Sequence, residues 1–400
     1  MNHKLLLIIF FISSFTLCSQ ETDSIRSNNI YEKIYSDKLD IEREITIQLP
    51  RDYNLDEEKR YPVFIVFDGD YLFEIVSGNV DYMSFWGDIP EAIVVGINQI
   101  DSRYNDTSVI DNINFTPISS TANFFEFVSQ ELIPYINKNY RTTNFRVAVG
   151  HERTANFINF FIIKKVPIMN GYIVVSPKFT KQMKKYLAQY LISSSHNIYY
   201  YLSTSSGDYY LSTSSGDYKS ISEDVLDFNQ RLDSLNNKNI HYKFQNLETP
   251  SHYTLPAYTI PHSIEDMFSI YKDINRVEYD SIILKLKTSP VRYLEEKYEK
   301  IKDHFGVIKE ISINDFVAVE QYIDETEKFN FFKDLAKLAT NKYKETILPS
   351  YYMGRFYEEN GNPEKAMHIY RSAYNMDDIA GITKEYLLQR ADVIADRYGY

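Results

Sequence analysis

One stretch decides the fold of this chain: Phe145-Arg146-Val147-Ala148-Val149-Gly150-His151-Glu152-Arg153-Thr154. Residues 145–149 predict a short buried strand, and residues 155–163, which follow the stretch, predict an apolar helix. A sharp turn that begins at Gly150 joins the two. A strand, a turn and a helix in this order form one βα unit, so the stretch predicts an α/β protein.

The same alternation continues on both sides of this unit. Residues 61–67 and 92–97 are continuous apolar runs, which are typical of strands buried on both faces of a sheet. Further strands are predicted at residues 44–50, 171–175, 197–203 and 241–247, and helices at residues 124–137, 181–191, 221–235 and 261–271. The pattern predicts a doubly wound, mostly parallel sheet with helices on both faces, within residues 30–275.

After about Asn275 the strand patterns stop, which predicts a small all-α domain over residues 276–400. Five residues in it have the spacing of one tetratricopeptide-like helical hairpin: Gly354, Tyr357, Ala366, Tyr370 and Ala373. The turn between the two helices is expected at residues 360–363. Two interpretations stay open: the helices bind a protein partner, or they form a cap that stabilises the sheet domain.

The first residues predict export. Residues 1–19 have a basic start, an apolar run from Leu5 to Leu17 and a polar end, as in a cleavable signal peptide. We therefore expect a secreted or periplasmic protein. Lipidation at Cys18 is the alternative, although Leu17 fits that signal poorly. A chain cleaved after residue 19 keeps no cysteine, which excludes disulfides and a thiol nucleophile.

Composition excludes several other function classes. The net charge is −12 and the pI is about 5.3, which argues against nucleic acid as a partner. No second apolar stretch is long enough to span a bilayer stably. No His/Cys/Asp cluster has zinc-site spacing, and no glycine-rich phosphate loop is present, so neither a metal nor a cofactor is expected.

The turn at residues 150–154 has the setting of the G-x-S-x-G nucleophile elbow of α/β-hydrolases. Here Glu152 replaces the serine and Thr154 replaces the last glycine. In such enzymes the acid and the histidine follow the nucleophile in chain order. Asp208 and Asp217 are both candidates for the acid, because residues 201–209 recur as residues 210–218. Asp217 is favoured because a predicted helix follows it closely.

His252 is the candidate histidine, since it follows the last predicted strand. At this point the chain resembles the putative esterase family, which includes esterase D, feruloyl esterases and enterochelin esterases. The matching stretches are residues 43–50, 61–69, 131–136, 140–142 and 171–177, Arg103 with Asp106, and His252 with Leu255-Pro256.

The resemblance covers roughly residues 30–275. It implies an α/β-hydrolase fold, a small-molecule ester as ligand and, where the elbow is intact, ester hydrolysis by a Ser-Asp-His triad. It also implies an oxyanion site on the backbone of Asp68, Gly69 and Arg153.

Glu152 changes the expected chemistry. A carboxylate is a weak nucleophile toward esters, and its charge opposes the oxyanion that must form beside it. Glu152 is expected to pair with His252 instead. The sequence therefore predicts an esterase-like protein that is catalytically impaired and acts by binding. The alternatives are an active carboxylic-ester hydrolase with a non-standard nucleophile, and a carboxylate nucleophile that attacks carbon.

Overall fold

The computed structural model describes residues 29–111, 116–207, 221–232 and 235–400. The predicted signal peptide, Cys18 and both candidate acids, Asp208 and Asp217, lie outside these ranges. In the described part of the chain, no helix has the length and apolar character needed to cross a membrane.

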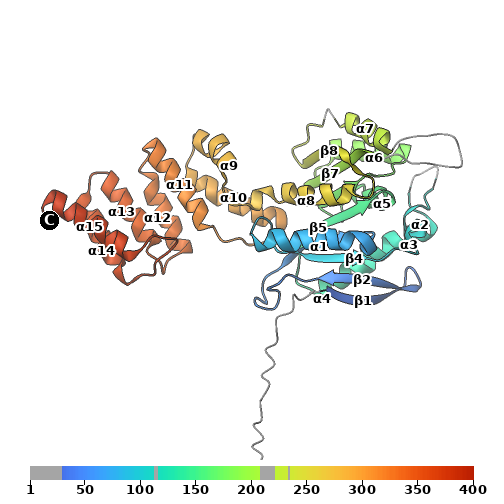
Figure 1. The fold of residues 1–400 in the computed structure, drawn as a ribbon, viewed down its shortest axis with the longest axis horizontal. Coiled ribbons are helices and arrows are strands. Elements are labelled where there is room, and N and C mark those ends of the chain that lie inside the picture. Colours follow the sequence, from blue (N-terminus) through green and yellow to red (C-terminus); the bar gives the residue numbers. More distant parts are fainter. Residues whose placement is uncertain (1–28, 112–115, 208–220, 233–234) are drawn as a thin grey trace, which may run out of the picture.

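The strands form one eight-stranded sheet in the order β1-β2-β4-β3-β5-β6-β7-β8 (Figure 1). Pairing is antiparallel from β1 to β2 and from β2 to β4, and parallel across the rest of the sheet. The predicted mostly parallel sheet is thus confirmed. The strands are β1 (Asn29–Ser36), β2 (Ile41–Gln48), β3 (Tyr61–Val66), β4 (Ile93–Ile97), β5 (Thr142–His151), β6 (Gly171–Val175), β7 (Ile198–Gly207) and β8 (Ile240–Ser251).

Helices cover both faces of the sheet, as predicted. Helices α1 and α8 pack on one face, and α3 to α7, including a π-helical turn η1, pack on the other. The central strands are apolar on both faces because each face is buried under helices. The bounds are α1 (Gly69–Phe85), α2 (Arg103–Thr107), α3 (Ser119–Glu126), η1 (Phe127–Leu132), α4 (Ile133–Asn139), α5 (Arg153–Ile162), α6 (Lys181–Ser193), α7 (Ile221–Arg231) and α8 (Leu255–Met267).

The start predicted for the helix at residues 261–271 is wrong. Helix α8 begins at Leu255, and Pro261 lies inside it. A proline is best tolerated in the first turn of a helix, and Pro256 fills that role here. The residues that follow form a separate 3₁₀ turn, η2 (Ser269–Tyr271).

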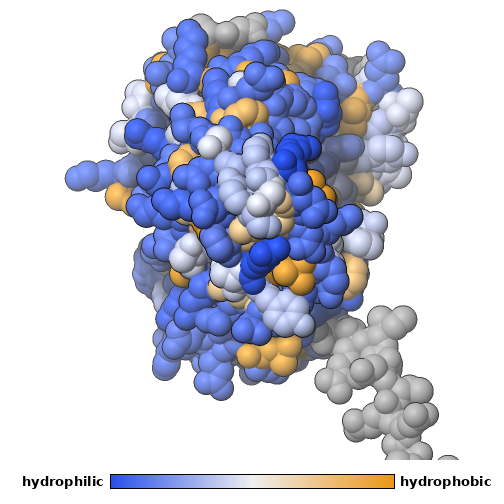
Figure 2. Space-filling model, turned by 90° about the vertical axis from the view of Figure 1, so that its left-hand side faces the viewer, coloured by the Kyte–Doolittle hydropathy of each residue, from blue (hydrophilic) through white to orange (hydrophobic). Residues whose placement is uncertain are grey.

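Beyond η2 every described element is helical, and these helices extend away from the sheet (Figure 1). The end of the stack, seen in Figure 2, is largely hydrophilic. A polar outer face is what a terminal helix needs in order to end such a stack. The elements are α9 (Arg276–Ser281), η3 (Ile283–Lys285), α10 (Pro290–Phe305), α11 (Ile313–Thr326), α12 (Phe331–Lys342), α13 (Leu348–Glu359), α14 (Pro363–Ser372), η4 (Ala373–Asn375) and α15 (Lys384–Tyr398).

The hairpin predicted from small and large residues is present as α13 and α14. Gly354 on α13 faces Tyr370 on α14, and a Cβ on Gly354 would overlap the tyrosine ring. The glycine is therefore needed for the two helices to approach closely.

Gly354→Ala is expected to lower the free energy of unfolding by about 1–3 kcal/mol, because it overpacks this contact. Urea denaturation measures the change. Gly78→Ala on α1 is the matched control, since its added Cβ would meet nothing within 4 Å. If both variants unfold at the same urea concentration, the close approach does not limit stability.

The helical region contacts the sheet through α10. Phe305 packs edge-on against Phe145 of β5, with ring centroids 5.0 Å apart. The Tyr199 hydroxyl lies 2.9 Å from His304 Nδ1, and the His241 ring stacks on Tyr199 at 4.3 Å. Two histidines are thus packed where the helical region meets the sheet.

Acidification is expected to weaken this contact. Burial lowers the pKa of His241 and His304, and the positive charge of Lys300 lowers that of His304 further, while Asp303 opposes this. The neutral forms are therefore favoured in the folded protein. The stabilisation that the neutral histidines give to the folded protein is complete above the usual histidine pKa of about 6.5. It is lost as the pH falls through their lower pKa values in the folded protein.

Thermal midpoints of wild type and His304→Gln, compared at about pH 7.5 and about pH 5, measure this effect. The wild type should lose more stability than the variant on acidification. An equal loss in both proteins would contradict the assignment to His304.

Candidate functional site

The turn at Glu152 lies where the sequence predicts it, between β5 and α5 at the C-terminal end of a central parallel strand. Glu152 has φ 57° and ψ −103°, a conformation that is rare for a residue with a side chain. Its N–H donates to the carbonyl of Val175 at 2.9 Å, and its carbonyl accepts from the N–H of Lys178 at 3.1 Å. The neighbouring strand end thus holds the strained residue in place.

Gly150 permits the tight turn. A Cβ at this position would lie 2.7 Å from the backbone of Thr154. Thr154, which replaces the last glycine of the motif, lies in a fully buried position. Its hydroxyl lies 2.6 Å from Asp68 Oδ2 and 2.9 Å from the carbonyl of His151. Thr154 therefore joins the polar network of the site.

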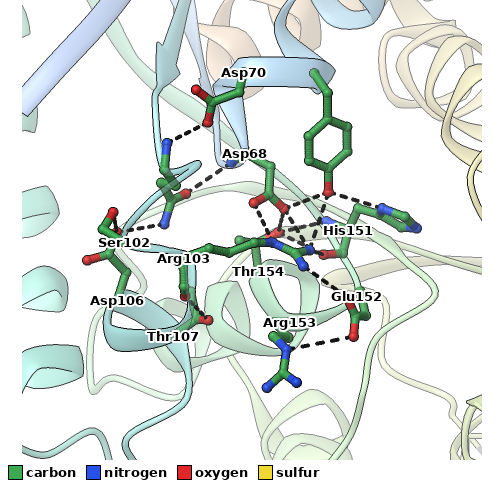
Figure 3. A network of polar contacts seen from close by, with 12 residues as sticks. Asp68, Asp70, Ser102, Arg103, Asp106, Thr107, His151, Glu152, Arg153 and Thr154 are labelled. Atoms are coloured by element: carbon green, nitrogen blue, oxygen red, sulfur yellow. Dashed lines mark hydrogen bonds and ion pairs between the residues drawn. The ribbon is translucent and has the colours of Figure 1, made fainter. Parts of the chain in front are cut away.

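The Glu152 carboxylate forms an ion pair with Arg103. Arg103 Nη1 donates to Glu152 Oε2 at 2.9 Å, and Arg153 Nε lies 3.8 Å from Glu152 Oε1 (Figure 3). The Glu152 side chain is 7% exposed, whereas those of Arg103 and Arg153 are 26% and 29% exposed. The carboxylate is therefore covered by guanidinium groups that still reach solvent.

Arg103 is itself held by a second buried carboxylate. Its Nε and Nη2 donate to the two oxygens of Asp68 at 2.7 and 3.1 Å, a bidentate arrangement that fixes the guanidinium plane. Nη2 also donates to the carbonyl of His151 at 3.0 Å. Asp68 is 1% exposed and lies in the left-handed region, with φ 54°. Glu152, Arg103 and Asp68 form one continuous network (Figure 3).

More distant polar residues support this network. The Asp68 N–H donates to Gln99 Oε1 at 3.0 Å, and the Gln99 N–H donates to Asp70. Gln99 Nε2 contacts Asp106, which forms a buried ion pair with Arg43. Burial raises the pKa of Asp106, and the charge of Arg43 opposes the rise. The start of α2, which carries Arg103, is thereby anchored on both sides.

Two histidines lie beside the network. His252 follows β8 and precedes α8, as predicted, and its ring lies 4.5 Å from that of His151. His151 Nδ1 lies 3.2 Å from the Tyr71 hydroxyl, which donates to Asp68 at 2.9 Å. Burial and the charge of Asp68 raise the pKa of Tyr71, so its hydroxyl stays protonated.

The three backbone positions implied as an oxyanion site lie around the same turn. The Asp68 N–H is already bonded to Gln99. Gly69 lies where α1 crosses β4, and a Cβ there would be 2.8 Å from the Ile97 nitrogen. Arg153 begins α5, so its N–H has no acceptor within the helix. In the described part of the chain, no cluster of three or more His, Cys, Asp or Glu could hold a metal ion.

The structure brings Glu152, Arg153, Asp68, Gly69 and His252 to one edge of the sheet. Asp208 and Asp217 lie outside the described residues. No sequence pattern indicated the contacts of Tyr71 and His151 or the ion pair of Arg103. Arg103 was singled out only through the family resemblance, and no local pattern indicates its partner.

Residues 36–155 match the family model described as Putative esterase. Residues 36–155 thus carry the sequence signature of this esterase family. The structure of an uncharacterised protein from Capnocytophaga ochracea is 26% identical, with a TM-score of 0.80, over 92% of this chain and 99% of its own. At that coverage the likeness includes most of the helical region of the esterase-like chain.

An IroE-like serine hydrolase from Shewanella oneidensis is 18% identical, with a TM-score of 0.58, over 78% of this chain and 98% of its own. The BES protein from Bacillus cereus is 21% identical, with a TM-score of 0.51, over 62% of this chain and 97% of its own. At these identities, the two structures support the fold of the chain and nothing further. No curated protein matches the chain.

Proposed function

We propose that this protein is an exported, esterase-like binding protein whose former catalytic turn no longer performs ester hydrolysis. The observation that carries the proposal is the ion pair of Glu152 with Arg103 at the nucleophile position. A serine at this position would attack the ester carbonyl after losing its proton to a histidine. Glu152 has no such proton at neutral pH, and Arg103 neutralises the charge that would make it a nucleophile.

Geometry adds to the chemical argument. Developing negative charge on a substrate oxygen would lie beside the carboxylate of Glu152, which raises the energy of the transition state. One candidate oxyanion donor, the Asp68 N–H, already bonds to Gln99. Recruiting it would cost that buried hydrogen bond, about 1 kcal/mol or more. Both effects act against ester hydrolysis.

The network favours a role in binding because its charged groups are preorganised and partly open to solvent. Arg103 and Arg153 are each about a quarter exposed, at 26% and 29%. Groups fixed by buried partners lose little entropy when a ligand binds. Export rests on the signal pattern of residues 1–19. A protein partner for the helical domain, residues 276–400, remains part of the proposal.

The second candidate function is ester hydrolysis by an unusual route, favoured by one observation: His252 still lies at the turn, 4.5 Å from His151. In that case His252 acts as a general base for water, and Asp217 or Asp208 orients it. This route needs no serine.

An esterase assay on purified wild type with p-nitrophenyl acetate and methyl ferulate tests both functions. We expect no turnover above that of a His252→Ala control. Turnover by wild type that His252→Ala abolishes would replace the binding proposal with the hydrolytic one. Cleavage of the signal peptide is tested by sequencing the N-terminus of the exported protein.

A further inference from the structure

We propose that an exposed aromatic surface at the C-terminal end of α1 binds a neutral carbohydrate. Its residues, called here the aromatic end, are Tyr82, Phe85 and Trp86, which are 64%, 61% and 66% exposed. Spacings of three and four residues place them on one side of the helix. Asp68 of the Glu152 network directly precedes this 17-residue helix, so the aromatic end lies about 25 Å further along it. The inference therefore does not depend on what the Glu152 turn does.

The gathering of large aromatic side chains in solvent is what sets the aromatic end apart. Single exposed apolar residues are normal on a protein surface, whereas a contiguous group of them marks a binding surface. The Phe85 and Trp86 rings meet edge to face, with centroids 5.2 Å apart. Rings exposed to this extent leave apolar area that a ligand can remove from water.

Arg51 holds the aromatic end in place and adds polar groups to its border. Its guanidinium lies over the Phe85 ring, 5.0 Å from the centroid. The same group forms a bidentate ion pair with Asp81, from Nε to Oδ1 at 2.7 Å and from Nη2 to Oδ2 at 2.5 Å. Both charged side chains are partly open to solvent. Rings and hydrogen-bonding groups that are already fixed lose little entropy when a ligand binds.

This combination of rings and charged groups fits a sugar. A pyranose with equatorial substituents presents C–H bonds on its faces, which pack on the negative face of an aromatic ring, and hydroxyls at its edge. Hydroxyls both donate and accept, so they can bond to the Asp81 carboxylate and the Arg51 guanidinium. A purely apolar ligand would take these charged groups partly out of water without replacing their hydrogen bonds.

Two other occupants fit the aromatic end less well. A stable interface between two copies of the chain buries about 800 Å² on each partner, from about 20–30 residues, and this surface is far smaller. A bilayer with anionic lipids attracts basic segments, whereas Asp81 and Asp88 flank the three aromatic residues in sequence and the chain has a net charge of −12. A carbohydrate without charge avoids both difficulties.

Tryptophan fluorescence tests the inference directly, because Trp86 is the only tryptophan of the chain. The full mature protein is titrated with cellopentaose, a neutral chain of flat pyranose rings. A parallel titration uses sorbitol, an open-chain polyol that has hydroxyls but no ring face. We expect a saturable change in emission with cellopentaose and none with sorbitol at the same concentration of hydroxyls.

Calorimetric titration with cellopentaose compares the variants. Trp86→Ala should weaken binding at least about tenfold and Tyr82→Ala about threefold, because each removes ring area that packs on the sugar. Tyr374→Ala, at an exposed tyrosine of η4, is the matched control and should leave binding unchanged.

Unchanged binding of cellopentaose by a folded Trp86→Ala overturns the inference, and so does an equal response to sorbitol. Binding of phosphatidylserine vesicles in place of cellopentaose would also overturn it, because the aromatic end then contacts a membrane. The same holds for a wild-type dimer that Trp86→Ala dissociates, since a second copy of the chain then covers the rings.

Discussion

Glu152→Ser is expected to hydrolyse p-nitrophenyl acetate at least about 10²-fold faster than the wild-type protein, within the 10²–10⁴-fold that a positioned general base supplies. The turn that must present the serine is already formed, with φ 57° at residue 152 and backbone bonds to Val175 and Lys178. The substitution also removes the carboxylate that opposes an oxyanion. Both effects raise the rate.

Three controls separate a restored nucleophile from other causes. Glu152→Ala removes the same charge but supplies no hydroxyl, so it should stay inactive. His252→Ala in the Glu152→Ser background should abolish the gain, because the serine then has no base. Labelling by a fluorophosphonate reports the activated serine directly. Suppose that a folded Glu152→Ser variant neither hydrolyses the ester nor becomes labelled. Other parts of the site, and not only residue 152, would then no longer support catalysis.

The turn itself could be predicted from sequence because its signals are local. An apolar strand, Gly150 and an apolar helix follow one another within a short stretch, and each pattern is strong. The two ends of strand β5 were harder to predict from the sequence. β5 begins at Thr142 and ends at His151, so it includes polar residues whose strand pairing depends on β3 and β6.

β1 and α1 are among the elements that had no prediction, and the reasons differ. β1 (Asn29–Ser36) is an edge strand that pairs only with β2 in the described sheet and has mixed exposure, so its apolar pattern is weak. Helix α1 (Gly69–Phe85) does have a readable apolar face, formed by Leu72, Phe73, Val76 and Val80. That spacing is helical and could have been found.

The partner of Glu152 could not be predicted. Arg103 and Asp68 are 49 and 84 residues away in sequence, and the three side chains lie at the N-terminal ends of three different helices, α2, α1 and α5. They meet because parallel strands bring their C-terminal ends to one edge of the sheet. Charge alone suggested His252 as the partner. The structure places Arg103 at 2.9 Å from the carboxylate, and the His252 ring lies 4.5 Å from the His151 ring.

Arg103→Met is expected to lower the free energy of unfolding by about 3 kcal/mol, the low end of the range for breaking a buried ion pair. The substitution leaves Asp68, which is 1% exposed, and Glu152 without their shared cation. The low end applies because Arg103 itself is 26% exposed. The thermal midpoint should fall by about 10 °C, since a large domain loses about 2–4 °C per kcal/mol.

A second variant shows whether uncompensated charge causes the loss. Adding Glu152→Gln to Arg103→Met removes the charge of one of the two carboxylates that have lost Arg103. The double variant should therefore be more stable than Arg103→Met alone. Such a recovery is a coupling energy between residues 103 and 152, which independent sites would not show. Arg276→Met, at an exposed ion pair with Asp280, should change stability by less than about 0.5 kcal/mol. If the double variant is less stable than Arg103→Met, Glu152 stabilises the turn through its packing and backbone, and its charge is not what Arg103 compensates.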